Sequence, residues 1–494
     1  MQASHILKGS AVALTLTPLF AAAATKNPDA RRPNIVLVLA DQWRAKSTGY
    51  DGNPAVKTPN LDRLAGQSLN FCNTVSVCPV CTPYRASLMT GRFPLSTGMI
   101  VNDLHLPAEE LCMAEIFAQA GYETAYIGKW HLDGYGRKDY IPPGRRQGWD
   151  YWKASECSHH NVKSHYYAGN SDEMLYWDGF DVFPQTRDAQ QYIRDHSADK
   201  KPFILMLSYG PPHPGSSPAP EKYKSLYPLD QVALPPNVPA DQEESARRWL
   251  QQYYALCTML DECVGDLLST LAETGAAKDT LFVFTSDHGG MLNSHGAPPT
   301  FKKMAWDEAA RVPFLLRYPA AHGDKGRIVE TPLTTPDILA TLLGLAGVTI
   351  PPSVEGESMA SLVTQGGELD RAALYMSPTP WMGGCYRAIR TSSHTFIRNL
   401  DGSLLLFNDR KDPFQLVNLA SNPESAPLLL ELSGRLDEML KRTGDGFLPP
   451  ETILQQWGLD INPNQSAGYT TEPLKPGELR KVILPRRSQP SQRR

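Results

Sequence analysis

Two pairs of residues that can bind metals follow apolar segments typical of buried strands. Asp41 and Gln42 come directly after one such segment, and Asp287 and His288 come directly after another. The carboxyl ends of parallel strands open into one crevice, so we expect both pairs to project into the same place. A single aspartate at such a position is more often a helix cap. Two pairs at equivalent strand ends favour a site for a divalent cation such as calcium or magnesium.

Cys81 lies in a segment that suits the start of a helix. Pro83 is favoured inside a first helical turn, and the unpaired amides of a helix N-terminus attract anions. Arg85, one turn later, can face the same site. The alternative is a buried cysteine beside a structural arginine. Cys78 and Cys81 also have the spacing of a redox or zinc pair, but the chain has no second pair of that kind.

Four basic side chains occupy comparable places. Lys129 and His131 follow one predicted strand and alternate in direction, so both can point inward, and His213 follows another strand. Lys302 lies in the segment after Asp287. A lone lysine or histidine at such a place is usually solvated or caps a helix. Their convergence on one edge of a sheet instead favours a site for an anion.

The elements that must position these residues alternate between strands and helices. Five apolar runs predict strands buried on both faces of a parallel sheet: Asn34–Ala40, Thr124–Ile127, Phe203–Ser208, Thr280–Ser286 and Val312–Arg317. Helical patterns lie at Ala108–Ala120, where Pro107 suits the helix start, and at Ala246–Thr274 and Asp337–Ala346. The alternation predicts an α/β fold with a large, doubly wound, mostly parallel sheet flanked by helices.

The pattern changes after about residue 365. Tyr386–Arg398 and Ser403–Asn408 predict antiparallel strands around a turn at Asp401-Gly402, and Ala426–Arg442 predicts a helix. This is typical of a smaller α+β domain that carries an antiparallel sheet. We therefore expect a catalytic domain over residues 25–365, a C-terminal subdomain over 366–443 and a proline-rich basic tail over 444–494.

The N-terminus predicts export. Residues 1–24 have the features of a signal peptide: Lys8, the apolar run Ala11–Ala24 and small residues at its end. That run is too short to span a bilayer. The chain of 494 residues has a net charge of −4, which argues against binding to nucleic acid or to an anionic membrane. We expect a secreted or periplasmic protein, whose eight cysteines permit disulfides without indicating a pairing.

With these residues in place, the chain resembles the sulfatase family of the alkaline phosphatase superfamily. Cys81-Thr82-Pro83-Tyr84-Arg85 fits the Cys-x-Pro-x-Arg modification signature of that family, and Leu88-Met89-Thr90-Gly91 follows at the usual offset. Gly121–His131 fits its second signature. The resemblance extends from Pro33 to about Arg442 and implies the same two-domain fold.

The resemblance also implies a mechanism and a role for each site residue. A maturation enzyme would oxidise Cys81 to formylglycine before folding is complete; one hydroxyl of the hydrated aldehyde would attack sulfur and the other would expel sulfate. A divalent cation, calcium first and magnesium or manganese next, would acidify the nucleophile. Its ligands would be Asp41, Gln42, modified Cys81, Asp287 and His288. Arg85 and Lys129 would hold the diol, and His131 would remove its proton. His213 and Lys302 would bind the sulfate group, with Lys303 as the alternative to Lys302.

Three positions depart from the common family pattern. Gln42 stands where a second aspartate is frequent, and His288 stands where asparagine is frequent. Asp-Gln with Asp-His resembles the branch of choline sulfatases and phosphonate monoester hydrolases, and also some carbohydrate sulfatases. An imidazole ligand is unusual for calcium, so the identity of the metal stays open. Tyr84 is bulkier than the serine common there, which leaves recognition by the maturation enzyme open.

The loop Asp139–Tyr167 is a candidate wall of the substrate pocket. It is rich in side chains that suit sugar stacking and anionic contacts, with loop filler as the alternative and a second metal site at its histidines less favoured. These residues are Arg145, Arg146, Trp149, Trp152, His159, His160 and His165.

The sequence thus predicts a sulfate ester hydrolase that acts on a sulfated carbohydrate. The alternatives are a phosphonate or phosphate diester hydrolase or a choline or aryl sulfatase on the same scaffold, and a non-catalytic protein that binds sulfated glycans. The oligomeric state is not indicated.

Overall fold

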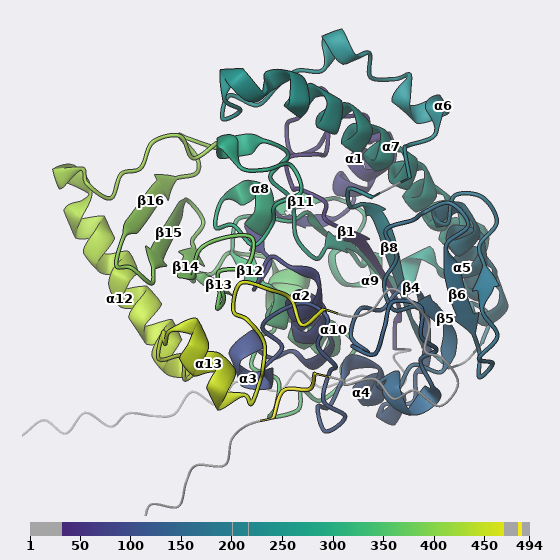
Figure 1. The fold of residues 1–494 in the computed structure, drawn as a ribbon. Coiled ribbons are helices and arrows are strands. Elements are labelled where there is room, and N and C mark those ends of the chain that lie inside the picture. The colour runs from purple at the N-terminus through teal and green to yellow at the C-terminus, as the bar shows by residue number, and fades with distance from the viewer. Residues whose placement is uncertain (1–31, 200, 216, 469–482, 487–494) are drawn as a thin grey trace, which may run out of the picture. The chain divides into compact units, whose positions relative to one another are not determined.

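The computed structural model describes residues 32–199, 201–215, 217–468 and 483–486 (Figure 1). The predicted signal peptide lies outside these residues. A sheet of ten strands has the order β11-β2-β10-β9-β1-β8-β4-β5-β6-β7. The strands are β1 (Asn34–Asp41), β2 (Leu69–Phe71), β4 (Glu123–Lys129), β5 (Tyr151–Ser155), β6 (His165–Ala168), β7 (Leu175–Tyr176), β8 (Phe203–Pro212), β9 (Thr280–Ser286), β10 (Phe314–Arg317) and β11 (Arg327–Val329).

The centre of the sheet is parallel. Strands β9, β1, β8, β4 and β5 are neighbours in this order and run the same way, so their carboxyl ends lie along one edge. Leu37 of β1, for example, is in register with Met206 of β8 and Val283 of β9. The outer strands β10, β6 and β7 are antiparallel to their neighbours.

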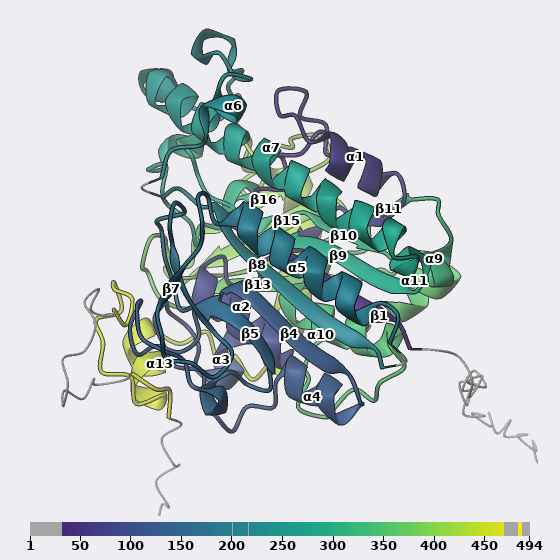
Figure 2. The ribbon, with the colours of Figure 1, turned by 90° about the vertical axis from the view of Figure 1, so that its right-hand side faces the viewer.

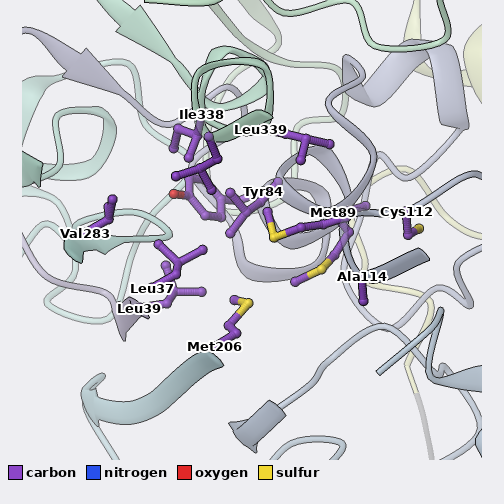
Figure 3. Packing of buried hydrophobic residues seen from close by; sticks show 14 of the residues in the cluster. Leu37, Leu39, Tyr84, Met89, Cys112, Ala114, Met206, Val283, Ile338 and Leu339 are labelled. Carbon is purple, nitrogen blue, oxygen red and sulfur yellow. The ribbon is translucent and has the colours of Figure 1, made fainter. Parts of the chain in front are cut away.

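Helices cover both faces of the sheet because alternate residues of each central strand are apolar on opposite sides. Leu37 and Leu39 pack toward α2 (Cys81–Thr90) and α10 (Thr335–Leu345), as Figure 3 shows. Val36 and Val38 pack on the other face, where α5 (Val182–His196) and α7 (Glu243–Glu273) lie across the strands (Figure 2). The remaining helices here are α1 (Pro59–Ala65), α3 (Pro94–Thr97), α4 (Met113–Gln119), α6 (Glu221–Lys224), α8 (Asp307–Ala310), α9 (Pro319–His322) and α11 (Ala360–Gln365).

A second sheet follows toward the C-terminus. It has the order β13-β14-β15-β16 and is antiparallel throughout. The helix α12 (Ala426–Arg442) packs Leu432 and Leu436 against one face, and Figure 1 shows it along that sheet. The other face packs against Ala305, which precedes α8, and Ala310, which ends it. The strands are β13 (Ala373–Ser377), β14 (Tyr386–Arg390), β15 (His394–Asn399) and β16 (Leu404–Asn408), while β3 (Thr74–Val75) and β12 (Leu333–Thr334) form a separate pair.

The fold class predicted from the sequence is confirmed, with local corrections. The helix expected from Ala108 begins only at Met113, because Glu115 accepts a hydrogen bond from the Cys112 amide and closes a capping box there. The strand expected from Val312 begins at Phe314, since the Val312 amide instead donates to the carbonyl of Thr74. The range 386–398 divides into β14 and β15.

The described part of the basic tail contains a helix that the sequence analysis did not predict, α13 (Pro450–Gln456). Trp457 and Leu459 pack into the core of the large sheet. Further on, the Ala467 amide donates to the carbonyl of Asn102, and the His105 amide donates to the carbonyl of Ile483. Residues 98–105 are therefore held by segments from the end of the chain. Among the described residues, no helix combines the length and apolar character that a membrane crossing requires.

Candidate active site

Four neighbouring parallel strands each deliver a polar side chain to the same edge of the sheet. Asp41 ends β1, Lys129 ends β4, His213 follows β8 and Asp287 follows β9. Cys81 is the first residue of α2, whose preceding residue has extended backbone. The structure thus brings together residues that are far apart in the sequence, at the edge where the pattern placed them.

Two buried carboxylates form the floor of the site. Asp41 Oδ2 accepts hydrogen bonds from Lys129 Nζ at 2.6 Å and Arg85 Nη2 at 3.0 Å, and Asp287 Oδ2 accepts one from Arg85 Nη2 at 3.2 Å. Burial raises the pKa of Asp41, but Lys129 and Arg85 together bring it well below its usual range. Burial and the neighbouring Asp41 raise the pKa of Asp287 to about 6. A further cation next to Asp287 would favour its charged form.

The residues around these carboxylates suit a divalent cation. Donor atoms of Asp41, Cys81, Asp287 and His288 all lie within 4.8 Å of one another. The Nδ1 atom of His288 donates to the carbonyl of Gly289 at 2.6 Å, because a carbonyl can only accept. In the neutral ring the lone pair of Nε2 therefore faces the cluster, 3.6 Å from Asp287 Oδ1. Burial lowers the pKa of His288, but Asp287 and Cys81 raise it above its usual value, so without a metal the charged ring is favoured. A metal-binding histidine is commonly oriented in this way.

Gln42 completes the donor set with an amide in a constrained position. Its backbone has a φ of 63°, which is costly for a residue with a side chain. The backbone N–H of Gln42 donates to Asp287 Oδ1 at 2.9 Å. A Cβ added at Gly290 would lie 2.3 Å from Gln42 Nε2, so glycine leaves the room that this side chain occupies. Two carboxylates, an amide and an imidazole fit a divalent cation and do not single out calcium.

Cys81 lies at the centre of the site and is only 1% exposed. Its Sγ is 3.3 Å from His288 Nε2, 3.5 Å from Lys302 Nζ and 3.8 Å from Lys129 Nζ. Burial and Asp41 raise the pKa of the thiol, but the two lysines and His288 bring it well below its usual value. The position therefore stabilises negative charge on whatever atom stands there.

Lys302 and His213 lie on the outer side of Cys81. Lys302 Nζ is 3.0 Å from His213 Nε2 and 3.4 Å from Gln42 Oε1, and none of its contacts among the described residues is a carboxylate. Burial and Lys302 hold the pKa of His213 well below its usual value, so His213 is neutral and accepts from the ammonium group. Lys303, the alternative lysine, points away and donates to Thr379 Oγ1.

His131 is buried beside the site and is paired with a residue that the sequence analysis missed. Its Nε2 lies 3.0 Å from Asp103 Oδ1. Burial lowers the pKa of His131, but Cys157, Asp103 and Cys81 raise it to about 10. Asp103 gave no signal because it lies in a loop without periodicity.

Three other residues near the site were also missed. Ser208 Oγ accepts from Arg85 Nη1 at 2.7 Å. Glu156 accepts from the amides of the turn that follows His131. Cys157 comes next, and although burial raises its pKa, His131 and Lys129 bring it well below the usual value. Both residues follow β5, whose last residue pairs with Lys129 at the end of β4, but β5 is too polar to stand out in the sequence.

The loop Asp139–Tyr167 does not supply the predicted sugar-stacking surface. Trp149 and Trp152 are 3% and 1% exposed and pack around Tyr126 in the core. Arg145 is paired with Asp133. The two buried tryptophans cannot stack on a sugar, and the hypothesis is wrong for them. The other residues lie as follows: Arg146 is buried and donates to the carbonyl of Ile141, His165 contacts the carbonyl of Arg137, His160 is exposed, and His159 stacks on His213 at 4.4 Å.

The hypothesis of a redox or zinc pair is also unsupported. Cys78 lies in the apolar core that the second sheet forms with α12, away from the buried donor cluster that includes Cys81. All eight cysteines, each within the described residues, are free thiols.

Comparison with known proteins agrees with this geometry. Residues 33–348 match the sulfatase family model, and residues 300–442 match the model of the C-terminal region of N-sulphoglucosamine sulphohydrolase. An ulvan-active sulfatase of Formosa agariphila is 46% identical over 88% of this chain and 86% of the relative. An endo-4-O-sulfatase of Bacteroides thetaiotaomicron is 29% identical over 86% of this chain and 96% of the relative.

Solved structures agree as well. The structure of a protein assigned as the sulfatase yidJ of Bacteroides fragilis is 28% identical. It superimposes with a TM-score of 0.77 over 87% of this chain and 100% of that chain.

Proposed function

Since the chain belongs to the sulfatase family, we propose that it hydrolyses sulfate esters of a carbohydrate with a formylglycine made from Cys81 and a divalent cation. The observation that carries the proposal is the surroundings of Cys81 Sγ. Two ammonium groups and an imidazole nitrogen lie within 4 Å of it, beside two buried carboxylates. This arrangement favours negative charge at the nucleophile and also attracts the anionic sulfate group.

The modified Cys81 supplies two hydroxyl groups on one carbon, one to attack sulfur and the other to expel sulfate. Lys129 Nζ and Arg85 hold the carboxylate of Asp41 beside that carbon. In its neutral form, His131 takes the proton of the second hydroxyl. The electron pair of that O–H bond becomes the carbonyl bond, and the bond from carbon to the sulfate oxygen breaks and leaves its pair on sulfate.

The cation would be held by Asp41, Gln42, modified Cys81, Asp287 and His288. When bound, it acidifies the nucleophile and neutralises sulfate oxygens. Calcium is the first choice on family resemblance, with magnesium or manganese next. On the outer side, Lys302 and His213 hold the sulfate oxygens, and one of them protonates the leaving alcohol.

The substrate proposal rests on two relatives, an ulvan-active sulfatase and an endo-4-O-sulfatase. We also propose that the protein acts outside the cytoplasm, in the periplasm or the medium, where polysaccharide fragments are met. Lys302 and His213 suit a group with one substituted oxygen. A phosphonate or phosphate diester carries one more substituent, which would displace one of these donors.

The test is sulfate release by protein made together with a formylglycine-generating enzyme. Mass analysis of the Cys81 peptide should show conversion of thiol to aldehyde, and removal of metal should abolish the release. Ulvan, chondroitin and heparan oligosaccharides are compared with an aryl sulfate, choline sulfate and an aryl phosphonate ester. We expect release from a sulfated sugar to be fastest. Silence on every sugar, or faster turnover of the phosphonate, contradicts the proposal.

A further inference from the structure

We propose that Asp103 is a positioning residue that fixes the orientation and tautomer of His131, so that Nδ1 is the nitrogen that takes the proton. The role in catalysis rests on the proposed function, while the pairing itself does not. The two residues lie on different loops, Asp103 after α3 and His131 after β4.

The pairing determines which imidazole nitrogen is basic. His131 Nε2 lies 3.0 Å from Asp103 Oδ1, and both side chains are buried. An ionised carboxylate only accepts hydrogen bonds, so Nε2 carries a proton and the lone pair of the neutral ring is on Nδ1. The hydrogen bond to His131 outweighs burial and keeps the pKa of Asp103 low, so the carboxylate is ionised. A buried aspartate orients the imidazole in the same way in Ser-His-Asp triads.

The backbone holds the pair in register with Cys81. His131 and Asp103 have φ values of 61° and 69°, a conformation that residues with a side chain adopt only when their surroundings enforce it. Thr82 supplies part of that enforcement: its Oγ1 donates to the carbonyl of His131 at 3.0 Å and accepts from the Asp103 amide at 3.2 Å. Because Thr82 follows Cys81 directly, its hydroxyl group fixes the backbones of His131 and Asp103 relative to the reacting residue.

The far side of Asp103 is held by the end of the chain. Ser466 donates a hydrogen bond to its carboxylate, and the neighbouring Ala467 amide donates to the carbonyl of Asn102. Asn102 also accepts from the Thr82 amide, through Oδ1 at 2.9 Å. The contacts of Ser466 and Ala467 come from beyond residue 442, where the match to the family models ends. The pairing is therefore over-determined, as expected for a group that must keep one orientation.

The first experiment reads the tautomer directly and needs no activity. Protein that keeps Cys81 as a thiol is labelled with ¹⁵N-histidine, and the His131 signals are assigned by their loss in His131→Gln. In the wild type we expect Nε2 to stay protonated through an alkaline titration while Nδ1 loses its proton. In Asp103→Asn, whose amide can donate or accept, both nitrogens should report a mixture. An Nε2 proton that is equally fixed in Asp103→Asn overturns the inference.

The second experiment measures kinetics on the matured enzyme. Asp103→Asn should lower kcat about 10³-fold with KM nearly unchanged, as expected when a general base loses its orientation. Asp103→Glu, which keeps the charge, should recover part of kcat. In a His131→Gln background the Asp103→Asn change should cost little more, because Asp103 acts through His131. The matched control is Asp445→Asn, which removes a buried aspartate paired with Arg387 in the small domain and should leave kcat unchanged.

The outcomes separate the two proposals. A higher KM with unchanged kcat, or full additivity in the His131→Gln background, overturns the positioning role. A wild type without sulfatase activity that nevertheless keeps the fixed Nε2 proton contradicts the proposed function and supports the pairing. If Asp103→Asn unfolds at assay temperature, the Asp103→Glu variant alone carries the test. A folded Asp103→Glu that keeps the Nε2 proton and part of kcat supports the positioning role, and one that keeps the Nε2 proton but loses kcat overturns it.

Discussion

Two parts of this protein bury several charged side chains, and they balance the charges differently. One is the Cys81 site, with Asp41, Arg85, Lys129, Asp287 and Lys302. The other, which we name the α8–β14 network, consists of Asp51, Asp307, Arg311, Arg390 and Asp409.

In the α8–β14 network each guanidinium is matched by carboxylates. Arg390 Nη1 lies 2.6 Å from Asp307 Oδ1 and 3.3 Å from Asp409 Oδ2, and Arg311 pairs with Asp51 at 2.7 Å. At the Cys81 site, Lys302 faces an amide oxygen, a thiol and an imidazole instead. A balanced buried network is weak evidence for anything but structure. An ammonium group that lies beside a nucleophile and has no carboxylate partner indicates an anion-binding site.

Removal of the reacting atom should have the largest effect. Cys81→Ala should reduce sulfate release to background in enzyme made with active maturation, because no other side chain can supply the two hydroxyl groups. Its circular dichroism spectrum should match the wild type. The control is Cys78→Ala, three residues earlier in the apolar core, which should keep its kcat. Turnover by Cys81→Ala would remove the basis for calling this region a site.

A pair of Asp→Asn variants should separate the two regions. Asp287→Asn should lower kcat by about 10³-fold and also lower the bound metal, while stability changes little because burial already disfavours its charge. Asp307→Asn removes a carboxylate that pairs with both Arg311 and Arg390. It should lower the free energy of unfolding by about 3–5 kcal/mol. Metal analysis, kinetics and denaturant unfolding measure the three quantities.

The opposite results would contradict the distinction between the two regions. If Asp287→Asn unfolds while Asp307→Asn loses turnover in the folded state, the difference in charge balance does not separate function from structure.

The unbalanced lysine should matter for binding. Lys302→Gln should lower kcat/KM about 100-fold, because it removes a charged donor to sulfate. It should also abolish the rise in melting temperature that inorganic sulfate gives the wild type. Lys303→Gln, its sequence neighbour that donates to Thr379, is the control and should keep the sulfate effect. Equal loss in both variants would mean that neither lysine faces the substrate.

The smallest expected effect concerns pH. Burial raises the pKa of Asp409 to about 6. Its folded-state pKa lies above the unfolded value, so stability falls as pH rises from about 4 to 6, by at most about 1.4 kcal/mol per pH unit, and then levels off. Asp409→Asn should flatten that slope with no change in kcat. Unfolding free energies at several pH values measure this slope. An unchanged slope in Asp409→Asn would show that burial does not raise the pKa of Asp409.

The sequence predicted the residues that end long apolar strands and missed those that end polar ones or lie in loops. Asp41 and Lys129 end β1 and β4, and Asp287 follows β9; the buried runs of these strands are easily found. Asp103 and Glu156 have no such marker. The predicted role of Trp152 was wrong because an aromatic residue in a polar segment can either stack on a sugar or pack in a core. Only its contact with Tyr126 of the neighbouring strand β4 decides between the two.

The edge strands of the large sheet escaped prediction for a similar reason. β2, β6 and β7 are two to four residues long, which is too short for a local period to mark them. The central strands carry their own signal because both of their faces are covered by helices.

The contacts of residues 98–105 with Ala467 and Ile483 have a consequence for biosynthesis. A chain made from its N-terminus reaches these two partners after every strand has been synthesised. Until then the Asn102 carbonyl and the His105 amide must be hydrated by water, and the loop that carries Asp103 lacks its final support. The edge of the sheet that carries the candidate site is thus encoded early and supported late, so a chain that stops before Ala467 has every described strand and lacks these two contacts.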